Sequence, residues 1–412
     1  MFYFSTRNKG ESFSFTQAAL TGLAPDGGLF IPQAIPVYRN AVKNSLGTMS
    51  FQEIAFETIL PYVEGEIPDP VLEDLCAGAF PFAAPLVQIH PETSKAEPTV
   101  PLVLELFHGP TAAFKDFGAR FMARTFSWLR RGEDKPLSIL VATSGDTGGA
   151  VADGFFGIQG ISVTILYPKG RISELQEKQI AGRSSLNGIE SNIHALAVEG
   201  SFDDCQALVK DAFGDPALQK NLVLSSANSI NISRLIPQTV YYAAAAGKAP
   251  AVTGGSSSPI TFCVPSGNFG NLTAGLYALS MGTPIAGFIA ATNINKTVPD
   301  YLESGEYKIR ESQATVSNAM DVGAPSNFER MAAHWNLDQL RRMIRGVSIT
   351  DDETRQTIKD VYKSYGYYLD PHGAVGWRGA IKVNASPTAV LATAHPSKFT
   401  ELVEKLTGPV PV

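Results

Sequence analysis

The sequence predicts an α/β fold with two open, mostly parallel sheets that are covered by helices. Short aliphatic runs alternate with amphipathic stretches, which is the pattern of strands joined by crossover helices. A polar loop rich in glycine or proline separates each run from the stretch that follows it. In parallel sheets such loops meet at the carboxyl ends of the strands, where ligands bind.

The strand–loop–helix units follow one another along most of the chain. In chain order their strands and loops are LSILVA with TSGDTGG (137–149), IHALAV with EGSFDD (193–204), ITFCV with PSGNFGN (260–271) and TAVLA with TAHP (388–396).

We expect three consecutive stretches. Residues 1–84 form an N-terminal segment of helices and turns, in which Ser50 and Glu53 predict a capping box at a helix start. Residues 85–250 form an α/β domain with Lys115 and the SGDTG loop, and residues 260–412 form another with the SGNFGN loop. The Gly/Ser/Pro-rich stretch from Gly247 to Ile260 predicts a flexible connection.

The composition is that of a globular protein with a large core. The chain has 412 residues, 44% of them hydrophobic and 17% charged. Its net charge of -6 gives no basic surface for nucleic acid. The apolar runs are too short to cross a bilayer, and MFYFSTRNKG lacks the pattern of a secretory signal. We therefore expect a cytoplasmic protein without a membrane or nucleic-acid partner.

Cysteines and histidines give no metal-binding pattern. Cys76, Cys205 and Cys263 are far apart, and the 6 histidines form no HxxxH or HExxH spacing. This favours buried free thiols in a reducing compartment and no metal.

A lysine in an unusual setting is the first candidate for chemistry. Lys115 lies in HGPTAAFKDFGARF, before a helical pattern of Phe117, Phe121, Thr125 and Trp128. Seen singly, such a lysine is usually a surface residue whose amine reaches water. A desolvated amine, in contrast, loses its proton more readily and becomes a nucleophile toward carbonyls.

The loop SGNFGN is a candidate for binding an anion. Gly267 and Gly270 let backbone amides approach an anion, Asn268 and Asn271 can donate further hydrogen bonds, and a helix begins here. The alternative is a plain strand–helix turn that needs a positive φ at one glycine.

Two more loops carry polar groups that could bind a ligand or have a purely structural role. In ATSGDTGG, Ser144 and Thr147 predict a carboxylate site at a helix start, while Asp146 or Thr147 could simply cap that helix. In TAHP, Thr393 could donate to a ring nitrogen or be a turn residue, and His395 could be a base or a structural group. A phosphate-binding loop together with a lysine that forms a Schiff base is what pyridoxal 5'-phosphate requires.

Several long motifs carry a resemblance to a known family. HGPTAAFKDFGARF, VATSGDTGGAVADGF, SANSINISR, VPSGNFGNLTAG, AATNIN and TAHPSKF occur in this order, with LAPDGGLFIP near the start. Together they resemble the threonine synthase family, in its longer bacterial and fungal type. The resemblance covers nearly the whole chain and implies the tryptophan synthase β-like fold, fold type II of the pyridoxal-phosphate enzymes, with the active site at the interface of the two α/β domains.

The resemblance implies a lyase that converts O-phospho-L-homoserine and water to L-threonine and phosphate. It implies that Lys115 binds the cofactor as a Schiff base and is the catalytic residue. The cofactor-binding residues that it implies are Gly267, Asn268, Phe269, Gly270, Asn271, Thr393 and Asp146.

For the substrate, the resemblance implies that Ser144, Gly145 and Thr147 receive the carboxylate. The substrate phosphate needs a second anion site, for which arginine is well suited. The candidates are Arg234 and Arg330, which polar residues flank, and Lys169 and Arg171.

Two other functions remain open on the sequence alone. One is a serine or threonine dehydratase of the same fold, and the other is a non-catalytic relative that binds pyridoxal phosphate. The chain could be a monomer or a homodimer.

Overall fold

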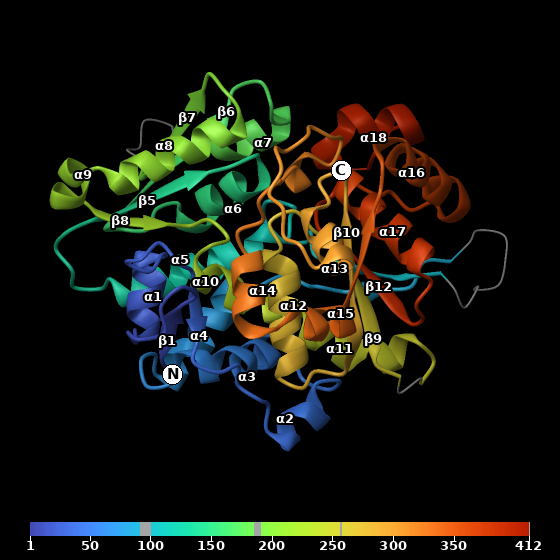
Figure 1. Cartoon of the computed structure of the whole chain (residues 1–412), viewed down its shortest axis with the longest axis horizontal. Coiled ribbons are helices and arrows are strands. Elements are labelled where there is room, and N and C mark those ends of the chain that lie inside the picture. Colours follow the sequence, from blue (N-terminus) through green and yellow to red (C-terminus); the bar gives the residue numbers. More distant parts are fainter. Residues whose placement is uncertain (91–99, 185–190, 256–257, 412) are drawn as a thin grey trace. The chain divides into compact units, whose positions relative to one another are not determined.

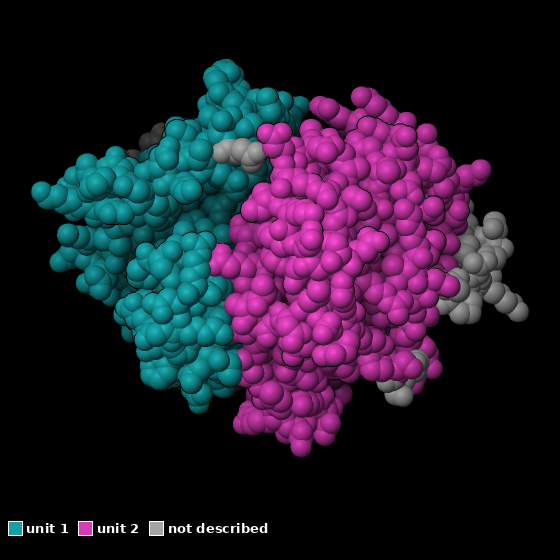
Figure 2. Space-filling view, in the orientation of Figure 1, with its two compact units in different colours: residues 1–34, 59–81, 109–237 teal, residues 35–58, 82–108, 238–412 magenta. Residues whose placement is uncertain are grey.

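A computed structural model describes residues 1–90, 100–184, 191–255 and 258–411. By its internal contacts, the described chain divides into two compact units (Figure 2). Unit 1 comprises residues 1–34, 59–81 and 109–237, and unit 2 comprises residues 35–58, 82–108 and 238–412. The consecutive stretches 1–84, 85–250 and 260–412 stay a prediction.

Unit 1 contains a parallel sheet and a small antiparallel ribbon (Figure 1). In the sheet, the described strands lie in the order β7-β6-β5-β8, and all neighbours pair in parallel. Their bounds are β5 Leu137–Ala142, β6 Ile161–Pro168, β7 Ile193–Val198 and β8 Val223–Ser226. The ribbon joins β1 (Tyr3–Ser5) to β2 (Phe30–Pro32), which the sequence analysis did not predict.

Helices of unit 1 include those predicted after Lys115, after the TSGDTGG loop and after the EGSFDD loop. Their bounds are α1 Phe15–Thr21, α4 Asp69–Ala79, α5 Lys115–Leu129, α6 Asp146–Phe155, α7 Glu174–Ala181, α8 Phe202–Gly214, α9 Pro216–Asn221 and α10 Ile232–Leu235. The helix predicted after Lys115 is confirmed, with Phe117, Phe121 and Thr125 buried. α3 (Phe51–Val63) and η1 (Ile236–Gln238) extend over the boundary between the two units' residue ranges.

The predicted capping box at the start of α3 is confirmed. Ser50 N–H donates to Glu53 Oε2 at 2.7 Å, and Glu53 N–H donates to Ser50 Oγ at 3.2 Å. These two bonds satisfy N–H groups that the first turn of a helix leaves without an intrahelical acceptor.

Unit 2 contains the larger sheet, with described strands in the order β11-β10-β9-β12-β4-β3. Every neighbouring pair is parallel except β3 and β4, which pair antiparallel. The bounds are β3 Leu86–Val87, β4 Leu102–Glu105, β9 Ile260–Pro265, β10 Ile285–Thr292, β11 Ile344–Ser348 and β12 Thr388–Ala392. Two open, mostly parallel sheets therefore confirm the predicted fold class.

The helices of unit 2 include one departure from the sequence prediction. Their bounds are α2 Asn40–Ser45, α11 Thr239–Val252, α12 Gly270–Ser280, α13 Thr297–Ser304, η2 Asn318–Met320, α14 Phe328–His334, α15 Leu337–Met343, α16 Asp351–Tyr365, α17 Pro371–Val383, η3 Pro396–Phe399 and α18 Thr400–Thr407. α11 continues to Val252, so the flexible connection predicted from Gly247 begins inside a helix, and its residues 256–257 lie outside the described ranges.

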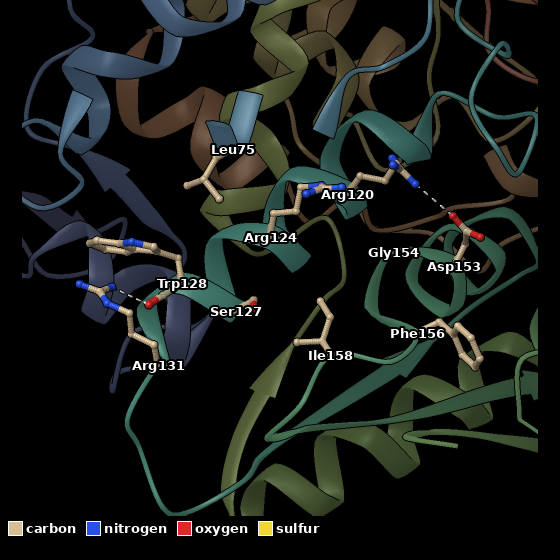
Figure 3. Close-up of a pocket in the computed structure, with 10 residues that line it drawn as sticks. All are labelled: Leu75, Arg120, Arg124, Ser127, Trp128, Arg131, Asp153, Gly154, Phe156 and Ile158. Carbon is tan, nitrogen blue, oxygen red and sulfur yellow. Dashed lines mark hydrogen bonds and ion pairs between the residues drawn. The ribbon is translucent and has the colours of Figure 1, made fainter. Parts of the chain in front are cut away.

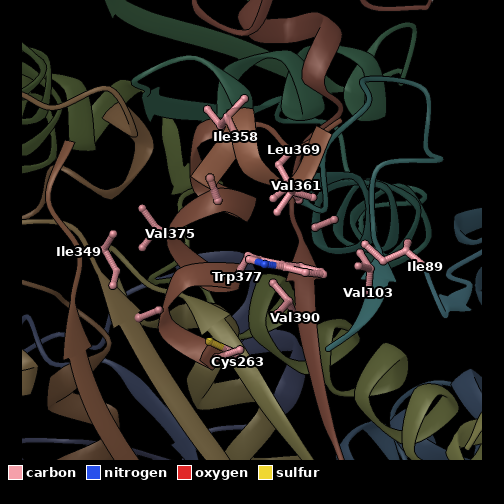
Figure 4. Close-up of a cluster of buried hydrophobic side chains, with 14 of the residues drawn as sticks. Ile89, Val103, Cys263, Ile349, Ile358, Val361, Leu369, Val375, Trp377 and Val390 are labelled. Atoms are coloured by element: carbon pink, nitrogen blue, oxygen red, sulfur yellow. The ribbon is translucent and has the colours of Figure 1, made fainter. Parts of the chain in front are cut away.

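Packing of α17 on the larger sheet forms much of the core of unit 2. Trp377 of α17 lies near the middle of a buried cluster that includes Val103, Cys263 and Val390 from three strands (Figure 4). Two glycines allow the close approach. A Cβ at Gly376 would lie 2.9 Å from Val390 Cγ1, and one at Gly379 would lie 2.9 Å from Ala291 Cβ.

Among the described residues, no helix is both long enough and apolar enough to cross a membrane.

The close packing of α17 gives a stability prediction. Gly379→Ala places a methyl group 2.9 Å from Ala291 Cβ and 3.1 Å from Val347 Cγ1. Overpacking of this kind costs about 1–3 kcal/mol, and the better helix propensity of alanine offsets about 1 kcal/mol of it. We expect a net decrease in the free energy of unfolding, measured by denaturant titration.

Gly214→Ala is the matched control. A Cβ at Gly214, at the end of α8, meets nothing within 4 Å. The same chemical change should therefore leave stability unchanged or raise it slightly. Equal shifts in both variants would contradict the role assigned to Gly379.

Candidate functional site

Polar loops of unit 2 gather at one edge of its sheet. β4, β12, β9 and β10 are parallel neighbours, so their carboxyl ends lie at the same edge. Thr393 directly follows β12, the loop Ser266–Asn271 follows β9, and Asn293 follows β10. This edge is where an open α/β sheet binds its ligands.

The backbone of the Ser266–Asn271 loop differs from the simple turn that the sequence left open. The positive φ falls on Phe269 (φ 59), which precedes α12, and not on Gly267 or Gly270. A bulky residue in this conformation is strained, which costs about 1–3 kcal/mol and is typical of functional loops. Gly267 is needed for another reason: a Cβ there would lie 2.7 Å from Met320 Cα and 2.9 Å from the Ala319 carbonyl oxygen.

Several donors in this loop have no protein acceptor. Within the described ranges, the backbone N–H groups of Gly267, Phe269, Gly270 and Asn271 make no hydrogen bond to protein. Asn271 Nδ2 is buried and likewise has no partner there. Buried side-chain donors such as Asn271 Nδ2 are nearly always satisfied, whereas the first N–H groups of any helix have no intrahelical acceptor. Together these donors can bind an anion such as a phosphate group.

Two tyrosines orient the Asn271 side chain. The hydroxyls of Tyr241 and Tyr242 donate to Asn271 Oδ1 at 2.7 and 2.5 Å. Burial raises the pKa of both tyrosines well above the usual value, so both hydroxyls keep their protons and remain donors. With Oδ1 occupied, the amide of Asn271 presents its Nδ2 for other acceptors. The sequence analysis did not identify these tyrosines, which lie on a different element, α11.

Thr393 is buried with 6% exposure, and its hydroxyl has no hydrogen-bond partner in the described part of the chain. Nearby in sequence, His395 caps η3, and its Nδ1 lies 2.7 Å from Ser397 Oγ. Burial, with a further contribution from His108, lowers the pKa of His395 below its usual value of 6.5. The imidazole is therefore neutral at pH 7, and its cap contact agrees with a structural role.

In unit 1, Lys115 occupies the first position of α5. It is half-buried, and its Nζ lies 4.7 Å from the centre of the Phe114 ring. The loop before it is held by Asp116, whose two carboxylate oxygens accept from Thr111 N–H at 2.9 Å and Thr111 Oγ1 at 2.6 Å. The lysine therefore extends from a fixed helix start.

The loop after β5 is shaped by Thr143. Its Oγ1 accepts from Gly145 N–H at 3.0 Å and from Gly148 N–H at 2.9 Å. In the described structure, the N–H and hydroxyl groups of Ser144 and Thr147 donate to no protein atom. Both residues are half-buried at the N-terminus of α6, which suits a carboxylate.

Helix α7 contacts both the loop before Lys115 and the start of α6, through residues that the sequence analysis missed. Gln176 Nε2 donates to Asp146 Oδ1 at 3.0 Å, and its side chain also completes the capping box of α7 with Ser173. Gln179 Nε2 donates to the Thr111 carbonyl at 3.2 Å. The S-x-x-Q pattern of Ser173 and Gln176 was the available signal, since it predicts a capped helix, but it gives no hint of the contact with Asp146.

Predicted residues for the substrate phosphate lie in different settings. Arg234 is 1% exposed, and its Nη1 donates to the Ala227 carbonyl, while Arg330 is 0% exposed, and its Nη1 donates to Asn327 Oδ1 at 2.7 Å. Burial lowers the pKa of each to about 10, so both remain charged at neutral pH. Lys169 pairs with Glu199 at 2.5 Å on the surface.

A cavity of about 600 Å³ in unit 1 is not lined by any predicted site residue (Figure 3). Its lining residues are Leu75, Arg120, Arg124, Ser127, Trp128, Arg131, Asp153, Gly154, Phe156 and Ile158. Arg120 donates to the Ala79 carbonyl at 3.2 Å and pairs with Asp153 at 3.3 Å, so it joins the end of α4 to α6.

The structure thus brings the Ser266–Asn271 loop and Thr393 to one edge of the sheet of unit 2, and it links the Lys115 loop to α6 through α7 in unit 1. No group of His, Cys, Asp and Glu side chains suited to a metal ion occurs among the described residues.

Comparison with known proteins shows the family to which the chain is similar. Residues 2–80 match the family described as threonine synthase N terminus, and residues 81–391 match the family of pyridoxal-phosphate dependent enzymes. The threonine synthase of Escherichia coli K12 is 43% identical, over 98% of this chain and 91% of its own length.

Solved structures give the same result. The crystal structure of Escherichia coli threonine synthase aligns with a TM-score of 0.89 at 41% identity, covering 100% of this chain and 92% of that one. The structure of threonine synthase with bound pyridoxal phosphate from Brucella melitensis aligns with a TM-score of 0.87 at 38% identity, with the same coverage of 100% and 92%. On these matches over nearly its full length, the chain belongs to the threonine synthase family of pyridoxal-phosphate dependent enzymes.

Proposed function

We propose that this chain uses pyridoxal 5'-phosphate to convert O-phospho-L-homoserine and water into L-threonine and phosphate. In the net reaction the Cγ–O bond to phosphate breaks and Cγ gains a proton, while Cβ loses a proton and gains the hydroxyl group of water. The observation that supports this best is the set of unpaired donors in the Ser266–Asn271 loop, in a chain of the threonine synthase family.

Lys115 is the proposed catalytic residue. When bound, pyridoxal phosphate supplies an electron-withdrawing ring that stabilises negative charge at the substrate Cα. The Lys115 amine binds the cofactor in the resting enzyme, and it then takes and returns the proton at Cα as general base and acid. Its position at the start of α5 fixes the backbone from which the side chain extends.

The Gly267–Asn271 segment is proposed to bind the phosphate of the same cofactor, with N–H groups and Asn271 Nδ2 as donors. Thr393 is proposed to donate its hydroxyl to the ring nitrogen, which keeps that nitrogen unprotonated, and Asp146 to lie near the 3' oxygen. The buried position of Thr393 and the fixed orientation of Asp146 by Gln176 support these assignments.

Ser144, Gly145 and Thr147 are proposed to receive the substrate carboxylate. The unpaired N–H and hydroxyl groups of Ser144 and Thr147 support this role. Arg234, whose guanidinium stays charged at neutral pH, is proposed to supply positive charge for the second phosphate. A cytoplasmic location is part of the proposal, because Cys76, Cys205 and Cys263 are buried free thiols, as expected in a reducing compartment.

Replacing Lys115 tests the cofactor chemistry. Lys115→Ala should abolish the visible absorption band of the Schiff base and threonine formation, because no other amine takes its place in this loop. Lys115→Arg keeps the positive charge and should lose both signals equally. An unchanged absorption spectrum in either variant would contradict the assignment.

Product analysis tests the reaction itself. With O-phospho-L-homoserine as substrate, inorganic phosphate and threonine should form in equal amounts. Formation of 2-oxobutanoate in place of threonine would indicate a dehydratase-type lyase, and no turnover despite bound cofactor would indicate a non-catalytic relative.

Gly145→Ala tests the carboxylate loop. Gly145 has φ 132, and a Cβ there would lie 2.3–2.5 Å from the side-chain amide of Gln176. The shifted loop should raise the KM for O-phospho-L-homoserine about tenfold or more, by the loss of one or two hydrogen bonds to a charged group.

Gly132→Ala is the matched control, since Gly132 has φ 81 but a Cβ there meets nothing within 4 Å. It should lower thermal stability and leave the KM unchanged. A rise of the KM in both variants would show a global effect of the substitution.

A further inference from the structure

Arg330 stands out as a charged side chain that is fully enclosed in unit 2. It lies on α14, its exposure is 0%, and its Nη1 donates to Asn327 Oδ1 at 2.7 Å. Burying a charged guanidinium costs free energy unless hydrogen bonds or opposite charges compensate for the lost hydration. The contacts of Asn327, which accepts one of these hydrogen bonds, indicate what Arg330 does.

Asn327 continues the contact to the phosphate-binding loop. Its Nδ2 donates to the Asn268 carbonyl oxygen at 3.1 Å, and its backbone N–H lies 3.4 Å from the same oxygen. Ser326 N–H donates to Asn268 Oδ1 at 2.5 Å. Both hydrogen-bonding ends of the Asn327 side chain are therefore occupied, one by Arg330 and the other by Asn268.

The geometry of the Asn268–Phe269 peptide means that the contact with Asn327 also orients the N–H of Phe269. In a trans peptide the carbonyl and the following N–H point in opposite directions. Because Asn327 holds the Asn268 carbonyl, the N–H of Phe269 is directed away from Asn327. That N–H is one of the donors without a protein acceptor in the described structure, and Phe269 is the residue with the strained φ of 59.

The positive charge of Arg330 strengthens this arrangement. A hydrogen bond from a charged guanidinium to Asn327 Oδ1 polarises the amide and makes its Nδ2 a stronger donor to the Asn268 carbonyl. A positive charge behind the loop also favours a dianion in front of it, because screening is weak in a buried site.

We propose that Arg330 is a positioning residue of the phosphate-binding loop, which acts through Asn327 to fix the Asn268–Phe269 peptide and thereby sets the affinity for the phosphate group of the cofactor. It does so without contacting the substrate phosphate. The inference rests on the proposed function only in taking pyridoxal phosphate as the ligand of the loop.

The test compares two ligands that differ only in the phosphate group. The full chain is freed of cofactor, and the Kd values of pyridoxal 5'-phosphate and pyridoxal are measured by absorbance titration. Arg330→Gln should raise the Kd of pyridoxal phosphate about tenfold or more, as expected for loss of a hydrogen bond to a charged group. The Kd of pyridoxal should stay within about twofold, since it lacks the affected group.

Further variants test the path through Asn327. Asn327→Ala should reproduce the loss, and it serves as the test if Arg330→Gln does not fold. The double variant should cost no more than the larger single effect, because both changes break one chain of contacts. Arg330→Lys, which keeps the charge with fewer donors, should recover part of the affinity.

Tyr38→Phe is the matched structural control. It removes a buried hydrogen bond of 2.6 Å to Thr58 in the same unit, and the Tyr38 backbone contacts Met281, beyond the opposite end of α12 from the phosphate-binding loop. It should lower stability without changing either Kd.

Three results would overturn the inference: an equal loss of affinity for both ligands in Arg330→Gln, additive effects of the Arg330 and Asn327 changes, or a raised KM for O-phospho-L-homoserine with an unchanged Kd of pyridoxal phosphate. The last would assign Arg330 to the substrate. Because binding is measured without turnover, failure of the unaltered chain to form threonine would count against the proposed function alone.

Discussion

A buried hydrogen-bond donor needs an acceptor, and this requirement governs the Ser266–Asn271 loop. Side chains of the protein donate hydrogen bonds to two carbonyl groups of the loop. Asn327 Nδ2 donates to the Asn268 carbonyl, and Thr273 Oγ1 donates to the Phe269 carbonyl. In the described ranges, five donors of the loop have no protein acceptor: the N–H groups of Gly267, Phe269, Gly270 and Asn271, and Asn271 Nδ2. A ligand rich in oxygen atoms, such as a phosphate group, can accept several of these hydrogen bonds at once.

Local patterns in the sequence predicted much of the fold. The strands at 137–142, 193–198, 260–264 and 388–392 and the capped helix after Ser50 are confirmed, because each depends on periodicity or capping within a short stretch. The polar loops after them were also predicted as the place for ligands, since parallel strands align their carboxyl ends.

Contacts between distant segments account for what was missed. Tyr241 and Tyr242 contact Asn271 from about thirty residues away in the sequence, and Gln176 contacts Asp146 at a separation of 30. For this loop the sequence left open a plain turn with a positive φ at a glycine, because glycine adopts that conformation readily. In the structure the positive φ falls on Phe269, and the preceding Asn268 contacts Ser326 and Asn327, which are distant in the sequence. The ribbon of β1 and β2 likewise joins residues far apart in the chain.

The two-residue strand β3 has a consequence for the behaviour of the chain in concentrated solution. It covers part of the outer side of β4 in antiparallel orientation and is the last of the described strands on that side of the sheet. A longer free border of backbone groups would invite pairing with another molecule and, from there, aggregation. Because β3 offers only Leu86 and Val87 for such pairing, this border of the sheet is a poor template for fibrous association.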